Sequence, residues 1–308
     1  MKSIESSRGS ATLLSLLLAA VVVTVGIGFN WLVKEHLRAA EGLKTKSEAM
    51  LRAVSVYDRL MYSILSGKTT AREVVLTSGE RVLGVKSIPL NNTTVKVDDD
   101  VEVKIQDSNG MVSLSSPNTS ALRRLLRNVR PGEDKTEVII NSFLDWIDQD
   151  TLVRVNGAEE AYYHAEGKPY APRNYPLQYK EEFAFIRGMD EELYRKAAPY
   201  LTLLPSSGFN PNTARDEVLT AYLDLGPEAL AALKAYMAQK PLTSATELFT
   251  VAGRTIEGTG EGSDFQPSRF WEVTIEVGKP KPVYSLRAGI DVRQGLNQPY
   301  SVVYWGRE

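Results

Sequence analysis

An uncharged apolar stretch near the N-terminus constrains this chain more than any other feature of its sequence. From Ser10 to Val33 there is no Asp, Glu, Lys or Arg. A helix of about 24 residues is ~36 Å long, which is enough to cross the ~30 Å hydrocarbon core of a bilayer. Charged residues are frequent in the rest of the chain. The sequence therefore predicts one membrane-spanning helix that anchors a polar body.

Two basic residues, Lys2 and Arg8, lie before the apolar stretch. Because positive charge is retained on the cytoplasmic side, they predict a cytoplasmic N-terminus and an exported C-terminal body. The alternative is a cleaved secretory signal, whose apolar region is about 7–15 residues long and ends in a small-residue cleavage site. Here the apolar run is longer, and Trp31, Lys34 and Glu35 follow it without such a site. An uncleaved span is the better interpretation.

The residues before the span, Ser6-Ser7-Arg8-Gly9, place a basic residue and a glycine at the membrane face. This pattern resembles the leader of type IV pilins and of the pseudopilins of type II secretion, which a prepilin peptidase cuts after the glycine. The resemblance implies a leader of residues 1–9, with Arg8, Gly9 and Ser10 as the processing site. Mature pilins usually begin with Phe, so methylation of the Ser10 amine is left open. An ordinary membrane anchor without cleavage is the alternative.

Leu14 occupies the fifth position of the implied mature chain, where most members of that class carry Glu. A lone carboxylate in a bilayer costs about 2.5–3.5 kcal/mol unless it is paired. In a growing fibre it can pair with the terminal amine of a neighbouring subunit, but the first subunit has no such neighbour. Leu14 therefore predicts a position at the tip of a fibre, although an ordinary anchor would also carry Leu there.

Beyond the span, apolar residues recur at three- and four-residue steps without proline, which predicts that the helix continues to about Leu65. Ser66-Gly67 predicts its end. The period then changes to two, which predicts strands at 74–76, 80–83, 94–97 and 101–105. Asn109-Gly110 is typical of a two-residue hairpin turn, so 101–105 should pair with 111–114. The aspartates at 98–100 predict a solvated turn.

From Pro117 the pattern is helical for well over a hundred residues, and it returns to strands near the C-terminus. Helices are predicted at 120–127, 135–147, 190–200, 213–225, 227–239 and 244–249, and strands at 269–277, 283–291 and 300–305. Strands on both sides of a helical block predict one sheet with an insertion. The predicted fold class is α+β, with a pilin-like long N-terminal helix packed on an antiparallel sheet and a large inserted all-α domain. We expect residues 10–33 in the membrane, a core of 34–116 and 266–308, and an insertion of 117–265.

Several motifs resemble, in order along nearly the whole chain, the K-type minor pseudopilins of type II secretion (GspK family). They are Asp145-Trp-Ile-Asp-Gln-Asp150, Gly157-Ala-Glu-Glu-Ala-Tyr-Tyr163, Leu203-Leu-Pro205, Phe209-Asn-Pro-Asn-Thr-Ala214, Asp107-Ser-Asn-Gly110 and Ser263-Asp-Phe-Gln-Pro-Ser-Arg-Phe270. The absent membrane glutamate agrees with that family. Phe209-Asn-Pro replaces a more usual branched aliphatic-Asn-Val sequence, and Ser115 stands where Asn is common.

The resemblance implies a non-enzymatic subunit that caps the pseudopilus tip, helps to initiate its assembly and supports protein export. The implied partners are the I- and J-type minor pseudopilins, the major pseudopilin and the prepilin peptidase. The implied location is the inner membrane, with a single span, a cytoplasmic N-terminus and a periplasmic body.

Four carboxylates form the densest set of oxygen ligands in the sequence: Asp148, Asp150, Glu159 and Glu160. Calcium takes six to eight oxygen ligands, often from irregular chain. We expect no balancing Lys or Arg close by, so that the cluster would repel itself without a cation. A solvated acidic loop is the alternative, since the spacing is not that of an EF-hand. The resemblance implies calcium in this region, with Asp145 and Asn174 as weaker candidates.

Other chemistries have little support in the sequence. There is no cysteine, which excludes disulfides and thiol catalysis. The two histidines, His36 and His164, lie in no catalytic motif, and Gly258 to Gly262 reads as a flexible connector, so a tethered hydrolase is disfavoured.

A second alternative is a membrane-anchored DNA receptor of the helix-hairpin-helix type around 241–253. Acidic residues surround that region, only Arg254 is well placed for phosphate, and we expect no nucleic acid as partner.

Overall fold

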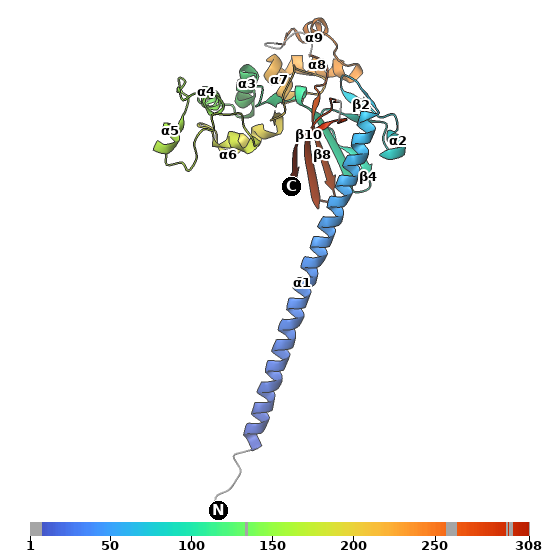
Figure 1. The fold of residues 1–308 in the computed structure, drawn as a ribbon, viewed down its shortest axis with the longest axis vertical. Helices are drawn as coiled ribbons and strands as arrows, with labels where there is room; N and C mark the ends of the chain where they lie inside the picture. Colours follow the sequence, from blue (N-terminus) through green and yellow to red (C-terminus); the bar gives the residue numbers. More distant parts are fainter. Residues whose placement is uncertain (1–7, 133–134, 257–263, 294, 296–297, 308) are drawn as a thin grey trace, which may run out of the picture. The chain divides into compact units, whose positions relative to one another are not determined.

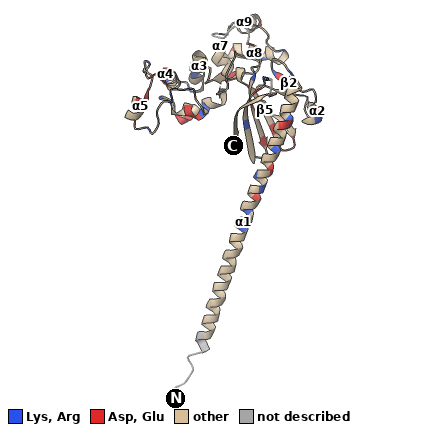
Figure 2. Cartoon of the chain, in the orientation of Figure 1, with Lys and Arg blue, Asp and Glu red and all other residues tan. Residues whose placement is uncertain are grey.

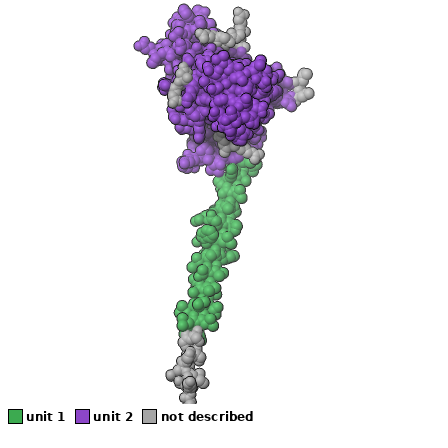
Figure 3. Space-filling view, turned by 90° about the vertical axis from the view of Figure 1, so that its left-hand side faces the viewer, with its two compact units in different colours: residues 1–52 green, residues 53–308 purple. Residues whose placement is uncertain are grey.

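The computed structural model describes residues 8–132, 135–256, 264–293, 295 and 298–307. The chain forms two compact units, Met1–Arg52 and Ala53–Glu308 (Figure 3). The described residues of the first unit, 8–52, are part of a single helix, and the second unit contains the sheets and all other helices of the described residues (Figure 1).

The long helix α1 runs without interruption from Arg8 to Leu65. Its apolar part has a mean hydropathy of 2.4 over the best window, so length and composition suit a membrane span. From Ser10 to Val33 the helix carries no Asp, Glu, Lys or Arg, and charged residues are frequent along α1 after Val33 (Figure 2). The helix ends where predicted, and the Gly67 amide closes its last turn on the Ile64 carbonyl at 3.0 Å. The predicted long helix is confirmed.

The main sheet has five antiparallel strands in the order β10-β9-β8-β5-β4. They are β4 (Val95–Asp98), β5 (Val101–Asp107), β8 (Phe270–Val277), β9 (Tyr284–Asp291) and β10 (Ser301–Arg307). The central pair β5 and β8 lies far apart in the sequence, yet it is in continuous register from Val101 opposite Val277 to Asp107 opposite Trp271. Strands from both sides of the helical segment therefore share one sheet, and the predicted fold class is confirmed.

The two faces of this sheet differ in polarity, as alternating side chains require. One face is apolar and buried, and the last turns of α1 are buried as well; Tyr57 of α1 meets Trp305 of β10 edge to face, with ring centroids 5.0 Å apart. The apolar face consists of Val101, Val103, Ile105, Val273, Ile275, Leu286, Ala288 and Ile290. The opposite face carries polar residues such as Lys104, Glu272 and Arg287.

The predicted hairpin at Asn109-Gly110 is wrong. These residues lie in a short 3-10 helix, η1 (Ser108–Gly110), and β5 pairs instead with β4 and β8. The chain then forms β6 (Val112–Ser113), which pairs in parallel with β7 (Leu201–Thr202). The reason is local, because the Asp107 side chain accepts a hydrogen bond from the Asn109 amide at 3.1 Å and caps η1. The chain leaves the sheet there instead of folding back.

A small second sheet follows α1, with β1 (Lys68–Thr69), β2 (Glu73–Val75) and β3 (Ser87–Pro89) in sequence order. The strand predicted at 80–83 is wrong, since this segment forms the helix α2 (Gly79–Val82). A Cβ at Gly79 would lie 2.5 Å from the Leu76 Cβ, so the glycine allows the tight turn that starts this helix. The predicted strand near residue 95 and the turn at 98–100 are confirmed.

The helical segment between β5 and β8 packs around its own apolar core (Figure 1). Its helices are α3 (Thr119–Val129), α4 (Thr136–Ile147), α5 (Glu160–Ala165), α6 (Glu191–Ala197), α7 (Asp216–Leu223), α8 (Pro227–Gln239) and α9 (Ala245–Ala252), with the 3-10 turns η2 (Lys180–Phe185) and η3 (Ala198–Tyr200). Aromatic rings fill the centre: Phe143 meets Phe183 edge to face, and Phe209 stacks on Tyr222 at 4.1 Å. The domain boundaries drawn from the sequence stay predictions.

A single buried carboxylate joins the helical segment to the sheet. Asp107, at the end of β5, is fully buried and accepts four hydrogen bonds. Its donors are the Asn109 amide at 3.1 Å, the Ser268 amide at 2.8 Å, the Thr213 hydroxyl at 2.8 Å and the Asn210 side chain at 3.4 Å. Burial raises the pKa of Asp107, and these donors oppose the rise because they favour the charged form. The two ends of the insertion meet at this group.

We predict that Asp107→Ala destabilises the protein strongly. The substitution leaves several buried donors without an acceptor, which costs about 3–5 kcal/mol in comparable buried networks. The free energy of unfolding is measured by denaturant titration of the full chain in detergent micelles. Asp99→Ala is the matched control, because the Asp99 side chain is fully exposed and its removal should change stability by no more than about 0.5 kcal/mol. Equal effects of the two substitutions would contradict the role of Asp107.

Candidate metal centre

The acidic motif lies where α4 ends and the chain becomes irregular. Asp145 is in the last turn of α4 and is fully buried, and Asp148 caps the helix with its amide on the Leu144 carbonyl at 3.1 Å. The chain then loops outward and returns at Glu159, which is 4% exposed and precedes α5. Asp145, Asp148 and Glu159 are thus held by two helix ends and the loop between them.

An arginine inside the loop neutralises part of this charge. Arg154 Nη1 donates to Asp145 Oδ1 at 2.7 Å and to Asp148 Oδ2 at a shorter distance. The Arg154 amide also faces both oxygens of Asp145, at 3.3 and 3.4 Å. Hydrogen bonds to Asp145 and Asp148 raise the pKa of Arg154 further above its ordinary value. The expectation that no basic residue balances the cluster is therefore wrong, because the loop folds Arg154 back onto α4.

Gly157 allows the loop to approach α4 this closely. A Cβ at position 157 would overlap Asp145 Oδ2, and it would also lie 3.1 Å from the Arg154 carbonyl. The Gly157 carbonyl accepts a hydrogen bond from Arg187 Nη1 at 2.8 Å, which ties the loop to the segment before α6. Glycine is required here by space.

Two buried carboxylate oxygens of the site, Asp148 Oδ1 and Glu159 Oε1, have no hydrogen-bond donor among the residues that the structure describes. Burial, followed by the negative charges of Asp145, Asp148 and Asp150, raises the pKa of Glu159 to about 7. Unsatisfied buried oxygens are rare in proteins and call for a proton or a cation. These two oxygens fit the hard, oxygen-binding chemistry of calcium.

The other predicted ligands lie around this pair without joining it. Asp150 Oδ1 accepts from the Leu152 amide at 2.8 Å, and Asn174 donates to the Asp150 carbonyl at 2.8 Å. Glu160 is exposed and faces His164 at 3.2 Å. No group of three or more His, Cys, Asp or Glu is arranged to hold a metal ion in the described part of the chain. A metal bound here would need Arg154 to release Asp145 and Asp148.

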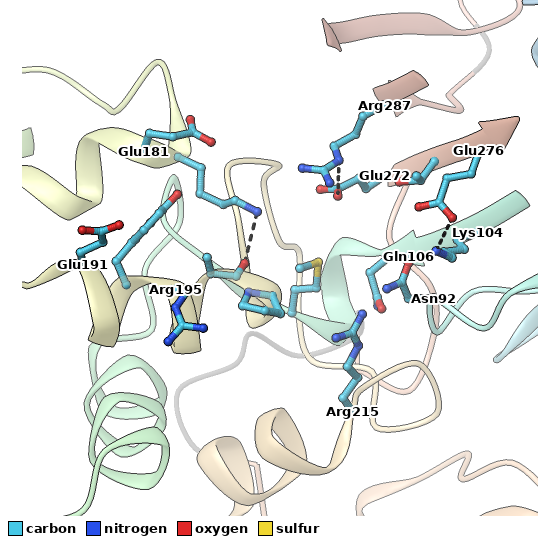
Figure 4. Close-up of a pocket in the computed structure, with 16 residues that line it drawn as sticks. Asn92, Lys104, Gln106, Glu181, Glu191, Arg195, Arg215, Glu272, Glu276 and Arg287 are labelled. Carbon is cyan, nitrogen blue, oxygen red and sulfur yellow. Dashed lines mark hydrogen bonds and ion pairs between the residues drawn. The ribbon is translucent and has the colours of Figure 1, made fainter. Parts of the chain in front are cut away.

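A cleft of about 620 Å³ lies between the polar face of the main sheet and η2, α6 and η3 (Figure 4). Its charged side chains are partly paired within the sheet: Lys104 contacts Glu276 at 2.8 Å, and Arg287 contacts Glu272 at 3.8 Å. No His, Cys or Ser lines this cleft among the described residues.

The remaining sequence candidates have simple positions. Arg8, Gly9 and Ser10 begin α1, while residues 1–7 of the leader lie outside the described residues, so leader cleavage stays a prediction. Leu14 is 61% exposed on α1. The glycine run 258–262 also lies outside the described residues. In the region considered for DNA binding, Lys234 is paired with Asp216 and Lys240 with Glu247.

Comparison with known proteins confirms the resemblance read from the sequence. Residues 92–206 match the family model described as type II secretion system (T2SS), protein K. A type II secretion system protein K of Pectobacterium carotovorum subsp. carotovorum is 33% identical over 123 residues, which cover 39% of this chain and 38% of that protein. Another, of Aeromonas hydrophila, is 27% identical over 249 residues, which cover 73% of each chain.

A similar fold is found in a crystal structure titled as the GspK-GspI-GspJ complex from the type 2 secretion system of enterotoxigenic Escherichia coli. The similarity has a TM-score of 0.56 at 18% identity and covers 90% of this chain and 99% of that chain. At this level of identity the match shows a similar fold and no more.

We predict that the calcium-free protein loses stability as the pH rises from about 5 to 8. The pKa of Glu159 is about 7 in the folded protein and about 4.3 in an unfolded chain, so folding favours the protonated form. Its contribution is fully present below the unfolded pKa and is lost as the pH rises through the folded value. Melting temperatures in a chelator should fall over this range. Glu159→Gln should flatten the profile, whereas Glu160→Gln, at an exposed position, should leave it unchanged.

Proposed function

We propose that this chain is a minor pseudopilin of the type II secretion protein K family, and that it caps the tip of the pseudopilus and helps to initiate its assembly. The proposal is supported chiefly by the place of the helical insertion within its unit. The Asn210 side chain donates to the Ala71 carbonyl at 2.9 Å, and Arg72 Nη1 donates to the Met237 carbonyl at 3.2 Å. The insertion therefore lies against the chain that follows the C-terminal end of α1.

In a fibre, a subunit added above this one would have to pack against the C-terminal end of α1. Pilin-like subunits assemble with their long helices side by side and their heads toward the tip, so a bulky insertion beyond α1 obstructs the next position. Leu14 supports the same role, because a first subunit has no neighbour whose terminal amine would pair with a glutamate. These two features together support the proposed roles in capping and initiation.

The proposed partners are the I- and J-type minor pseudopilins, since the similar solved structure is a complex of GspK with GspI and GspJ. The apolar side chains of α1 from Leu13 to Val33 are exposed and offer a surface for lateral packing with neighbouring helices. Below them we place the major pseudopilin, and the prepilin peptidase acts before assembly. The proposed location is the inner membrane, with the body in the periplasm.

We also propose that calcium binds at the end of α4. Asp148 and Glu159 supply the two unsatisfied oxygens, Asp145 joins when Arg154 is released, and Asp150, Glu160 and Asn174 lie nearby as further donors. The ion would supply positive charge to a buried acidic site. This chain's own residues hold the loop in position: Gly157 leaves space beside Asp145, and Arg187 fixes the loop from outside.

We predict that replacing Asp148 and Asp150 by Ala lowers the melting temperature in calcium and abolishes the response to chelator. The original chain should melt several degrees higher in calcium than in chelator, because a ligand stabilises the state that binds it. Asp98→Ala combined with Asp99→Ala is the matched control in an exposed turn and should retain the full response. If the original chain melts at the same temperature with and without chelator, the calcium proposal is wrong.

We predict that Leu14→Glu and Leu17→Glu impair secretion to a similar extent when they replace the native subunit in cells. At the tip neither carboxylate has a partner, so each costs about 2.5–3.5 kcal/mol in the bilayer. Inside a fibre, a glutamate at 14 would pair with a neighbour's terminal amine and be tolerated, whereas one at 17 would not. Secretion of a type II substrate and membrane levels of each variant are measured together. Normal secretion with Leu14→Glu alone would place the subunit below the tip.

A further inference from the structure

The two edges of the main sheet differ in how they are protected. The strand β4 at one edge is four residues long, carries Lys96 and Asp98, and runs into the aspartates of 98–100. Short length and charge are the usual devices that prevent an edge from pairing with another chain. The strand β10 at the other edge is seven residues long and has no charged residue before Arg307. Only one edge of the sheet is protected.

The outer side of β10 lacks a backbone partner. Throughout the described residues β10 pairs with β9 alone, from Ser301 opposite Asp291 to Arg307 opposite Leu286. A bulge between Val302 and Tyr304 interrupts the ladder, and from Tyr304 onward the register is regular. Unpaired amides and carbonyls on such a strand form a ready template for an added strand.

The two sides of this edge differ in chemistry. On the α1 side, Val302 and Trp305 lie opposite the buried Ile290 and Ala288, and they remain 45% and 41% exposed. On the cleft side a cavity of about 260 Å³ adjoins β10, between Tyr304 to Gly306 and the segment that leads into η2. The cavity contains both signs of charge, from Lys180, Glu181, Glu272 and Arg287, and these four residues also line the larger cleft of Figure 4.

We propose that β10 binds an extended segment of another polypeptide by β-strand addition, and that apolar and polar side chains alternate along this segment. Successive side chains of a strand point to opposite faces. Every second residue of the added strand would therefore cover Val302 and Trp305, and the residues between would enter the polar cavity. Backbone pairing provides affinity, and the cavity provides selectivity for polar side chains.

A second copy of this chain fits the edge less well than a different polypeptide. If two β10 strands paired, the side chains offered to the cavity would be Tyr304 and Gly306 of the second copy. The Tyr304 hydroxyl already donates to Glu272 at 2.9 Å, and glycine has no side chain to offer. The cavity needs polar groups that β10 does not supply. Strand addition at β10 depends on the sheet alone and does not require that the subunit lies at the tip.

The test measures binding of short fluorescent peptides to the full chain in detergent micelles by anisotropy. One peptide alternates valine and threonine, the second has the same composition in two blocks, and the third is the alternating peptide with every second amide methylated. The alternating peptide should bind saturably, and the other two should bind about tenfold more weakly or worse. The block peptide loses the alternation of side chains between the two faces, and the methylated peptide loses backbone hydrogen bonds. Hydrogen exchange of the β10 amides should slow when the alternating peptide is bound.

Val302→Lys and Val303→Lys place a charge on the edge without touching the buried core, and each should weaken binding by about tenfold or more. Val153→Lys is the matched control, since Val153 is 61% exposed and belongs to a loop far from β10 in sequence. The proposal is overturned if no alternating peptide binds, if block and alternating peptides bind equally, or if Val303→Lys binds as well as Val153→Lys. A dimer of the full chain in sedimentation that Val303→Lys dissolves would also overturn it, because the occupant would then be a second copy.

Discussion

The hydrogen bonds to the Asp107 carboxylate hold the two parts of the body together. The chain leaves the sheet at Asp107, and its return, 161 residues later, donates the Ser268 amide to the same side chain. Thr213 and Asn210 reach this carboxylate from the insertion itself. A buried charge is costly unless it is fully hydrogen-bonded, so both segments must be in place for it to be stable. The insertion and the sheet therefore stabilise each other through this carboxylate.

Buried carboxylates also lie at the end of α4, but there they are compensated only in part. Asp145 and Asp148 are compensated by Arg154, but Asp148 Oδ1 and Glu159 Oε1 are not compensated by any donor. Donors within the protein satisfy the carboxylate of Asp107 fully, but they satisfy the carboxylates at the end of α4 only in part. The proposed calcium would bind the oxygens that are left without a donor. If calcium replaces Arg154 there as proposed, the order of the loop depends on the cation concentration around the protein.

The two faces and the two edges of the main sheet have different surroundings. Its apolar face is buried, and Tyr57 at the top of α1 packs on Trp305 there. Its polar face lines the cleft below the insertion, and β4 is protected by its length and charge. The remaining edge, β10, is where the fold leaves backbone groups available to another chain. This asymmetry is compatible with the proposed position at the tip of a fibre, where lateral and distal contacts differ.

The sequence alone determined the elements whose signals are local. The helix to Leu65 and the alternation in β8 and β9 were predicted correctly because periodicity depends on near neighbours, while the membrane span drawn from the uncharged run to Val33 stays a prediction. Only the tertiary structure decided that Asn109-Gly110 is not a hairpin, since Asp107 caps η1 and its other donors come from Thr213 and beyond. It likewise decided that Arg154 folds back onto α4 and that β10 is left at an edge. The contacts of Asp107 with Thr213 and Ser268 and the pairing of β9 with β10 depend on how the whole chain folds, and Arg154 reaches Asp145 and Asp148 only because of the conformation of the loop between them.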